Sequence, residues 1–324
     1  MGHAPPKPGA DGGFVLPYVL LTITVMSILL TLAVSRMSDV TRSVERFSAD
    51  ADADLALASL EAEATFRLLS AVPVDAGLGL FDPSALSVDM LDTEFPDAVS
   101  MLGGRGTRVP SARTPGASFV ARDMAGLIPL NSLDADIMTL YLRSLGLGTD
   151  EAAGLTGKWM DYVDTDNRRS FRGAERGEYA LKGRPAPSNH PVRSHAEMQA
   201  ILDWDDFLVG DLRFQFMDET STNDRLTYFT TQHADPALVE RLEKASVGGR
   251  LERVVARNAD FVMGERTSDA WRLELDVPVA SGGRKIMVLD VERQIGALHQ
   301  PFRRNVVYKR TRPAAAAAQT ADAR

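Results

Sequence analysis

The chain has 324 residues, of which 44% are hydrophobic and 25% charged, and its formal net charge at pH 7 is −8. This acidic balance argues against a nucleic-acid binder held by bulk electrostatics, because affinity for phosphate needs a basic surface. The absence of cysteine excludes a disulfide framework, a thiol nucleophile and a cysteine-based zinc site. The length allows a membrane anchor together with one large or two modest domains.

Residues 14–34 form an apolar run without a charged side chain. A helix of that length spans roughly 31 Å, the thickness of a bilayer core, so residues 14–35 are predicted to be the transmembrane part of an N-terminal helix. A buried core helix is the first alternative, although such helices are rarely apolar on all faces. A cleaved secretory signal is the second, but its apolar region is shorter and a small-residue cleavage site is missing after Val34.

Apolar residues recur after the anchor at steps of three or four, which is one face of a helix. Pro73 ends the pattern. A single helix from Phe14 to about Ser70 would be roughly 85 Å long, with its second half free to pack on a sheet. A membrane helix followed by a separate amphipathic helix is the alternative. The positions of the apolar face are Val40, Val44, Phe47, Ala51, Leu55, Ala58, Ala62, Phe66 and Leu69.

The rest of the chain alternates between strand and helix signals. Residues 72–116 are predicted to be loops with short strands, and 118–123 a strand. Helices are expected over 134–145, 149–162 and 237–244, and from a capping box at Ser194 and Glu197. Alternation over 271–279 and 286–291 predicts a hairpin. The order predicts an α+β fold: a long N-terminal helix packed on an antiparallel sheet, with a mostly helical inserted domain.

The predicted organisation has six parts. They are a leader (1–13), the transmembrane part of the helix (14–35), a first sheet-forming part (36–130), an inserted helical domain (131–246), C-terminal strands (247–300), and a basic then low-complexity tail (301–324). The basic cluster of the tail is expected to be solvated, with contact to a membrane or an acidic partner as the alternative. Its members are Arg303, Arg304, Lys309, Arg310 and Arg312.

The acidic residues after position 160 are the strongest candidates for a binding site. Asp164, Asp166 and Glu175 fall at the first, third and twelfth positions of a loop, the spacing of carboxylates in an EF-hand, and Ca²⁺ prefers such oxygen ligands. The fifth and sixth positions are Arg168 and Arg169, so the loop is not an EF-hand. A solvated acidic loop neutralised by nearby arginines is an alternative. A glycosidase-type carboxylate pair is another, which nothing else supports.

Motifs of enzymes are otherwise missing. The five histidines form no H-x-x-x-H or H-E-x-x-H pattern, and the chain has no G-x-S-x-G, P-loop or G-x-G-x-x-G. We therefore expect a non-enzymatic protein.

Gly13 is followed by Phe14 at the start of the apolar helix, and the fifth position after Gly13 is Tyr18. Further along the chain stands a string of residues in a defined order and spacing: Leu127, Ile128, Pro129, Leu130, Asn131, Asp161, Tyr162, Val163, Asp164, Asp166, Gly173, Ala174, Glu175, Tyr179, Asn189, Pro191 and Glu197. Both regions resemble the minor pseudopilins of type II secretion, specifically the general secretion pathway protein K class, and the string matches that class in order and spacing. Gly-Phe before an apolar helix resembles the site cut by prepilin peptidases. Most pilins carry a glutamate at the position of Tyr18, and the K class typically lacks that glutamate. A second family motif after residue 205 is at best poorly matched by residues 221–224.

The resemblance implies a pilin-like fold whose inserted domain is similar to SAM or helix-hairpin-helix domains. It implies a subunit that caps and initiates the periplasmic pseudopilus and supports export of folded proteins across the outer membrane. Its implied partners are minor pseudopilins of the I and J classes, the inner-membrane secretion assembly and prepilin peptidase, which would leave a methylated Phe14. It also implies calcium binding, with ligands drawn from Asp161, Asp164, Asp166, Glu175, Glu178 and Asn189.

The implied location is the bacterial inner membrane, single-pass, with the C-terminal domain in the periplasm. Three arginines after the anchor, Arg36, Arg42 and Arg46, favour the opposite orientation by the positive-inside rule. The alternative function is a membrane-anchored DNA-handling protein with a helix-hairpin-helix module at residues 145–148. Asp150 and Glu151 follow that hairpin and would repel phosphate. A membrane-tethered, calcium-dependent hydrolase is a third hypothesis without a nucleophile–base pair to support it.

Overall fold

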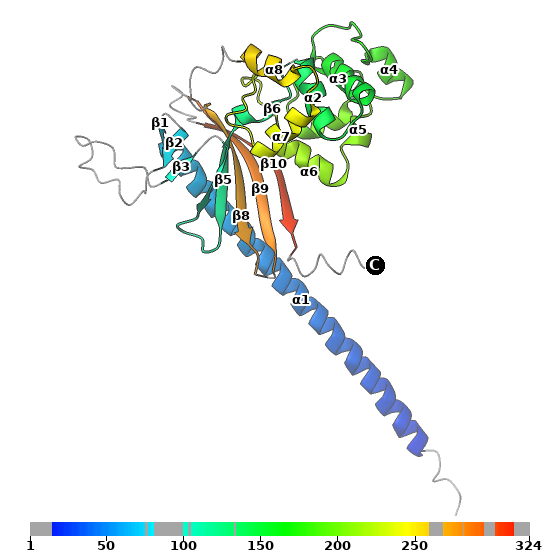
Figure 1. The fold of residues 1–324 in the computed structure, drawn as a ribbon. Helices are drawn as coiled ribbons and strands as arrows, with labels where there is room; N and C mark the ends of the chain where they lie inside the picture. The colour runs from blue at the N-terminus through cyan, green and yellow to red at the C-terminus, as the bar shows by residue number, and fades with distance from the viewer. Residues whose placement is uncertain are drawn as a thin grey trace, which may run out of the picture.

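The computed structural model describes residues 15–74, 77–80, 100–102, 105–132, 134–258, 268–280, 282–294 and 302–313. Figure 1 shows three parts: a long N-terminal helix, an antiparallel sheet packed against its C-terminal half, and a helical domain at the end of the sheet furthest from the N-terminus. The predicted α+β architecture is therefore confirmed.

Helix α1 (Val15–Ser70) is unbroken over 56 residues, as predicted. Its N-terminal part is long and apolar enough to cross a membrane, with a mean hydropathy of 2.2 over the best window. This part fits a single-pass membrane anchor. The predictions for the leader, Gly13 and Phe14 concern residues outside the part of the chain that the structure describes.

The face of α1 that packs on the sheet differs from the predicted one. The buried residues are Ala53, Leu57, Leu60, Ala64 and Leu68. The predicted stripe lies roughly 150° around the helix and is mostly exposed, with Phe47 at 78% and Leu55 at 72%. The helix thus has two apolar faces, and the sheet packs on the one made of leucine and alanine.

The main sheet has the strand order β10-β9-β8-β5-β4, with every neighbour antiparallel. The predicted hairpin is confirmed as β8 and β9. β10 corrects the prediction of a tail from residue 301, because these residues pair with β9 and carry Val306, Val307 and Tyr308 between two basic stretches. The bounds are β4 (Thr107–Pro110), β5 (Ser118–Asp123), β8 (Ala270–Pro278), β9 (Arg284–Arg293) and β10 (Phe302–Arg312). A small second sheet joins β1 (Val72–Val74), β2 (Gly77–Leu80) and β3 (Ser100–Leu102).

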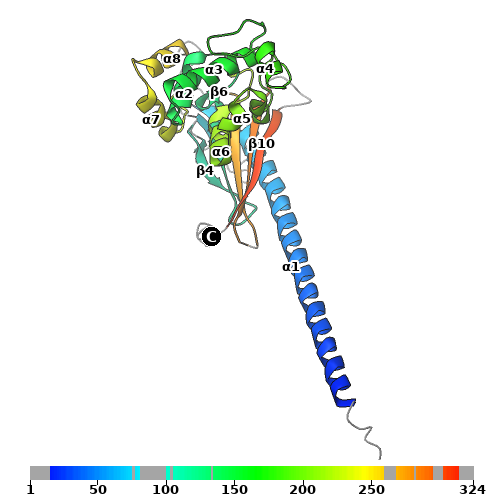
Figure 2. The ribbon, with the colours of Figure 1, turned by 90° about the vertical axis from the view of Figure 1, so that its right-hand side faces the viewer.

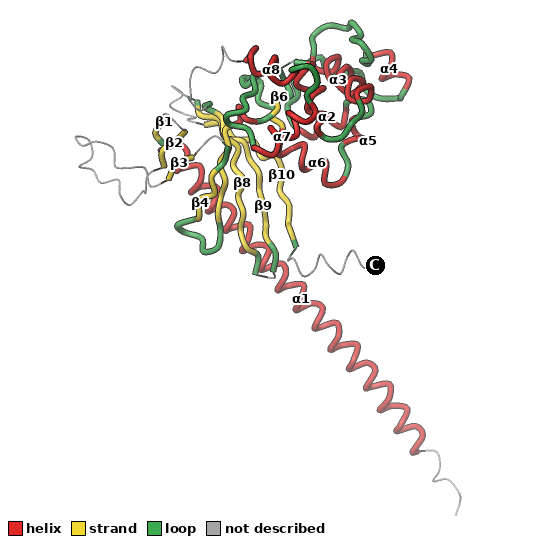
Figure 3. Tube along the Cα trace, in the orientation of Figure 1, coloured by secondary structure: helices red, strands yellow, loops and turns green. Residues whose placement is uncertain are grey.

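The helical domain is inserted between β5 and β8 and has its own core around Trp159, Trp204 and Phe216 (Figure 3). Its helices are α2 (Ala135–Ser144), α3 (Thr149–Val163), α4 (Arg176–Leu181), α5 (Trp204–Phe207), α6 (Gly210–Glu219), α7 (Pro236–Ala245) and α8 (Arg250–Asn258). Two 3-10 turns (Met124–Gly126 and His195–Ala200) and the parallel pair β6 (Ile128–Pro129) and β7 (Thr220–Ser221) complete it.

Asp134 caps α2, because its carboxylate accepts from the backbone of Asp136 and Ile137. The capping box predicted at Ser194 is corrected. Ser194 makes no capping bond with its side chain, and a 3-10 turn follows it. The capping-box glutamate belongs to α4 instead, where Glu178 accepts from the Glu175 amide.

The helical domain docks on the face of the sheet opposite α1 (Figure 2). Arg272 on β8 points to that face, since its neighbours Trp271 and Leu273 face α1. The buried guanidinium of Arg272 lies 2.7 Å from Asp290 on β9, and it also donates to the carbonyl of Met217 in α6. One side chain thus joins two strands to the inserted domain.

Replacing Arg272 by Met should lower the free energy of unfolding by about 3–5 kcal/mol, because it leaves the buried Asp290 without a partner. Chemical denaturation of residues 36–324 measures this loss. The double variant Arg272→Met, Asp290→Leu is the matched control and should recover most of the stability, since it removes both charges. A single variant as stable as the wild type would contradict the role given to this ion pair.

His195 lies in the same junction, with Nε2 3.0 Å from the Thr220 hydroxyl. Burial, with the charge of Arg272 second, lowers the pKa of His195 from 6.5 to about 4, while Asp290 opposes the shift. The neutral ring therefore stabilises the fold fully above pH 6.5, and this contribution of about 3 kcal/mol is lost as the pH falls towards 4. Unfolding measured across this range should show less pH dependence in His195→Asn. Equal slopes in the two proteins would refute the assignment.

Candidate metal centre

Two helix ends bring the acidic residues together. Asp164 is the C-cap that follows α3, Asp166 lies in the loop, and Glu175 is the N-cap of α4. One carboxylate oxygen from each of the three lies within 4.8 Å of the others. The three acidic residues, which are separated along the sequence, therefore form a cluster in the folded chain.

Several buried oxygens of the cluster lack a hydrogen-bond donor among the described residues. They are Oδ1 of Asp164, both carboxylate oxygens of Glu175 and Oδ1 of Asn189. Asn189 has a left-handed φ of 50°, and its amide group donates to the Asp166 carbonyl at 2.8 Å. Buried polar atoms normally have partners, so a group of unpaired acceptors fits a bound cation.

The electrostatics of the cluster agree with this interpretation. Burial raises the pKa of Asp164, and the charges of Asp166 and Asp161 raise it further. Burial likewise raises the pKa of Glu175, followed by the charges of Asp161 and Asp164. The carboxylates repel one another, and a divalent cation would reverse that repulsion.

Asp161 positions the loop that carries the cluster. Its buried carboxylate accepts from the Ser170 amide at 2.9 Å, and it leaves no room for a side chain at Gly173, where a Cβ atom would lie 2.0 Å away. Gly157 in α3 also lets the loop lie close to the helix, because a Cβ atom there would be 2.5 Å from the Phe171 carbonyl oxygen. This role of Gly157 was not predicted from the sequence, although a glycine inside a predicted helix can signal a close approach of another backbone segment.

Glu178 does not join the cluster. Its carboxylate accepts from the Glu175 amide at 3.0 Å and from Arg169 at 2.7 Å. The bond from Arg169 comes first among the causes that lower the pKa of Glu178. Of the six predicted ligands, the structure brings together Asp164, Asp166, Glu175 and Asn189, with Asp161 behind them.

The nearby arginines do not neutralise the cluster. Arg169 pairs with Glu178, and Arg172 pairs with Asp150 at 2.9 Å. Among the described residues, no ion pair reaches Asp164, Asp166 or Glu175. The alternative of an acidic loop held by its own arginines therefore lacks support.

A helix-hairpin-helix is present, but its surface is acidic. Helices α2 and α3 are joined by residues 145–148, with Gly146 at a φ of 98°. Asp150 and the exposed Glu151 follow this turn, in the first turn of α3. Such a turn does not favour phosphate, which is held by positive charge.

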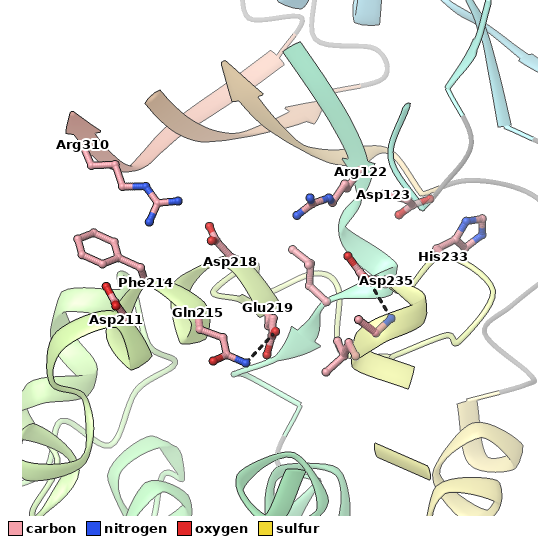
Figure 4. A pocket seen from close by; sticks show the side chains of 14 residues that line it. Arg122, Asp123, Asp211, Phe214, Gln215, Asp218, Glu219, His233, Asp235 and Arg310 are labelled. Atoms are coloured by element: carbon pink, nitrogen blue, oxygen red, sulfur yellow. Dashed lines mark hydrogen bonds between the residues drawn. The ribbon is translucent and has the colours of Figure 1, made fainter. Parts of the chain in front are cut away.

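Figure 4 shows the cleft of about 390 Å³ between the sheet and the helical domain. Arg122 and Arg310 enter it from the sheet, and Asp211, Asp218 and other polar side chains from the helices. The described residues that line it include no serine, threonine, cysteine or lysine.

Comparison with known proteins links the candidate centre to a family. Residues 126–213 match a family model described as type II secretion system (T2SS), protein K. This range contains α2, α3, α4 and all the clustered acidic residues. None of the curated proteins matches the chain.

The chain is similar to a solved chain of the GspK-GspI-GspJ complex from the enterotoxigenic Escherichia coli type 2 secretion system. The identity is 14%, the TM-score is 0.43, and the match covers 85% of this chain and 99% of that chain. A likeness at this level carries no argument by itself. The family match covers the inserted domain, which is therefore similar to protein K of the type II secretion system; in this chain the domain is joined to a long helix and an antiparallel sheet.

Proposed function

We propose that this protein is a minor pseudopilin of type II secretion, of the K class, and that it caps and initiates the pseudopilus in the periplasm and so supports export of folded proteins across the outer membrane. The single observation that carries the proposal is the arrangement of α1, which keeps an exposed apolar face opposite its own sheet while the helical domain sits at its far end (Figure 2). The first feature suits packing with sibling subunits, and the second would obstruct a subunit above.

The exposed face of α1 supports helix packing with other minor pseudopilins, which we propose to be of the I and J classes. Val40, Val44, Phe47, Leu55 and Phe66 are each at least 54% exposed in the single chain. Large apolar side chains in such a row normally indicate an interface. The neighbouring alanines of the stripe would let another helix approach closely.

The N-terminal end supports a terminal position. Tyr18 offers no carboxylate to the amine of a subunit above, unlike the usual pilin glutamate. We propose that prepilin peptidase cuts after Gly13 and leaves a methylated Phe14, that α1 anchors the chain in the inner membrane beside the secretion assembly, and that the C-terminal domain lies in the periplasm.

We also propose that the acidic cluster binds one Ca²⁺ ion through Asp164, Asp166, Glu175 and the Asn189 carbonyl. The unpaired buried oxygens favour this function for the cluster. Calcium takes six to eight oxygen ligands, so backbone carbonyls or water would complete the shell. The ion would tie the end of α3 to the start of α4 and so stabilise the inserted domain.

Calcium should raise the melting temperature of residues 36–324. An ion that binds only the folded state stabilises it by about 2.7 kcal/mol at a hundredfold excess over Kd, which corresponds to roughly 5 °C or more. Chelator should reverse the shift, and Mg²⁺ should substitute poorly because it demands a small octahedral shell. Calorimetry with and without calcium measures the effect.

The double variant Asp164→Ala, Asp166→Ala should lose the calcium response. Asp150→Ala with Glu151→Ala is the matched control, since these acids lie outside the cluster, and it should respond like the wild type. A wild-type melting curve that ignores both calcium and chelator would refute the calcium site while leaving the role in secretion untouched.

The exposed face of α1 can be tested by charge. Phe47→Arg with Leu55→Arg should abolish co-purification with minor pseudopilins and stop secretion, because burial of two such side chains is worth roughly 3–6 kcal/mol. The free energy of unfolding of the sheet should not change, since both side chains are exposed. Ser38→Arg, which lies roughly 130° around the helix from the centre of the stripe, is the control. Normal assembly and secretion by the double variant would rule out this face as the interface.

A further inference from the structure

The two edges of the main sheet differ. β4 is four residues long and ends at Pro110, whose nitrogen cannot donate a hydrogen bond. β10 is eleven residues long, mostly exposed, and bonded only to β9 among the described residues. Its outer side therefore presents a row of unpaired backbone groups that can template another strand.

β10 is also strongly basic, in a chain whose net charge is −8. Two of its five cations are engaged within the protein. Arg304 forms an ion pair with Glu61 of α1. Arg310 stacks over Phe214 and Tyr308, at 5.2 and 5.4 Å from the ring centres, on the wall of the cleft in Figure 4. The remaining three have no ion pair among the described residues; they are Arg303, Lys309 and Arg312.

The free cations lie on both sides of the edge. Lys309 pairs in register with Met287, which is buried against α1, so it shares that face of the sheet. Arg312 lies three residues further on and therefore faces the other side. An incoming strand would meet a positive charge on each face. The stretch from Tyr308 to Arg312 is in continuous register, because the bulge comes before it.

A membrane is too far away to be the partner. Thr311 lies beside Lys285, whose ammonium is 2.7 Å from Asp50 of α1. Asp50 is sixteen residues beyond the last apolar residue of the anchor, Val34, which is roughly 24 Å along the helix. The headgroup layer reaches only about 5–7 Å from the bilayer core, and the Debye length is about 8 Å at physiological ionic strength. Most of the attraction to lipid is therefore screened.

We propose that β10 accepts an acidic, extended segment of a partner protein as a sixth strand of the sheet. Backbone hydrogen bonds along the open edge would supply affinity, and the free cations would select for Glu and Asp on the incoming strand. This site is separate from the calcium cluster and from the exposed face of α1. The proposal can therefore be tested independently of the proposed role in capping the pseudopilus.

Charged residues on an edge strand can also serve only to prevent pairing. That reading makes a different prediction for the same residues: removing the charges would let copies of the chain associate through β10. The proposal instead predicts that removing them weakens one acidic ligand and leaves the chain monomeric.

The experiment uses the full chain in detergent micelles and a labelled peptide of repeated Thr-Glu-Val-Glu units. Fluorescence anisotropy should show binding, and hydrogen exchange should slow within residues 302–312. The same peptide with Lys for Glu should not bind. A version with Pro at alternate positions, which cannot pair as a strand, should not bind either.

Lys309→Glu with Arg312→Glu should weaken binding of the acidic peptide by about tenfold, as expected for two partly screened charges turned repulsive. Arg113→Glu with Lys182→Glu makes the same change in net charge elsewhere on the surface and should bind normally. The proposal is overturned if the acidic peptide does not bind, if the proline version binds equally well, if β10 gains no protection, or if the charge-reversed variant self-associates instead.

Discussion

The position of the inserted domain depends on one buried guanidinium. Arg272 is 2% exposed, and its donors reach both oxygens of Asp290 and the carbonyl of Met217. This arrangement is compatible with one register of β8 on β9 and one position of α6 over them. Apolar contact alone is less selective, because it tolerates sliding. Weaker polar contacts around it, such as Tyr308 with Asp218 and Arg225 with Glu292, follow from the same placement.

The acidic cluster depends in turn on the rigidity of the helical domain. Asp161 and Gly157 hold the loop of residues 164–175 against α3, so the clustered carboxylates cannot move apart without breaking buried contacts. Repulsion among them is therefore retained in the folded state. A bound cation would relieve this repulsion. Carboxylates that oppose folding on their own would then stabilise the folded domain.

Local signals in the sequence predicted much of the fold and of the site. The uncharged run, the helical steps up to Ser70, the β8–β9 hairpin and the spacing of Asp164, Asp166 and Glu175 are all patterns within one element or loop. Errors arose where long-range packing decides. The face of α1 that meets the sheet, β10 and the capping role of Glu178 depend on partners such as Leu289 and Arg169, and periodicity does not identify partners. The buried alanines of α1 look no different from exposed ones in the sequence.

The opposed faces of α1 also fix a radial order. Moving outward from the exposed stripe, one crosses the helix, then the sheet, then the helical domain. In a bundle of such helices the inserted domain would always lie at the periphery, whatever the rotation of the subunit along the bundle axis. Insertions between β5 and β8 can therefore grow or change sequence without disturbing the packed helices at the centre, so the outer domain is free to diverge while the packing face of the helix is kept.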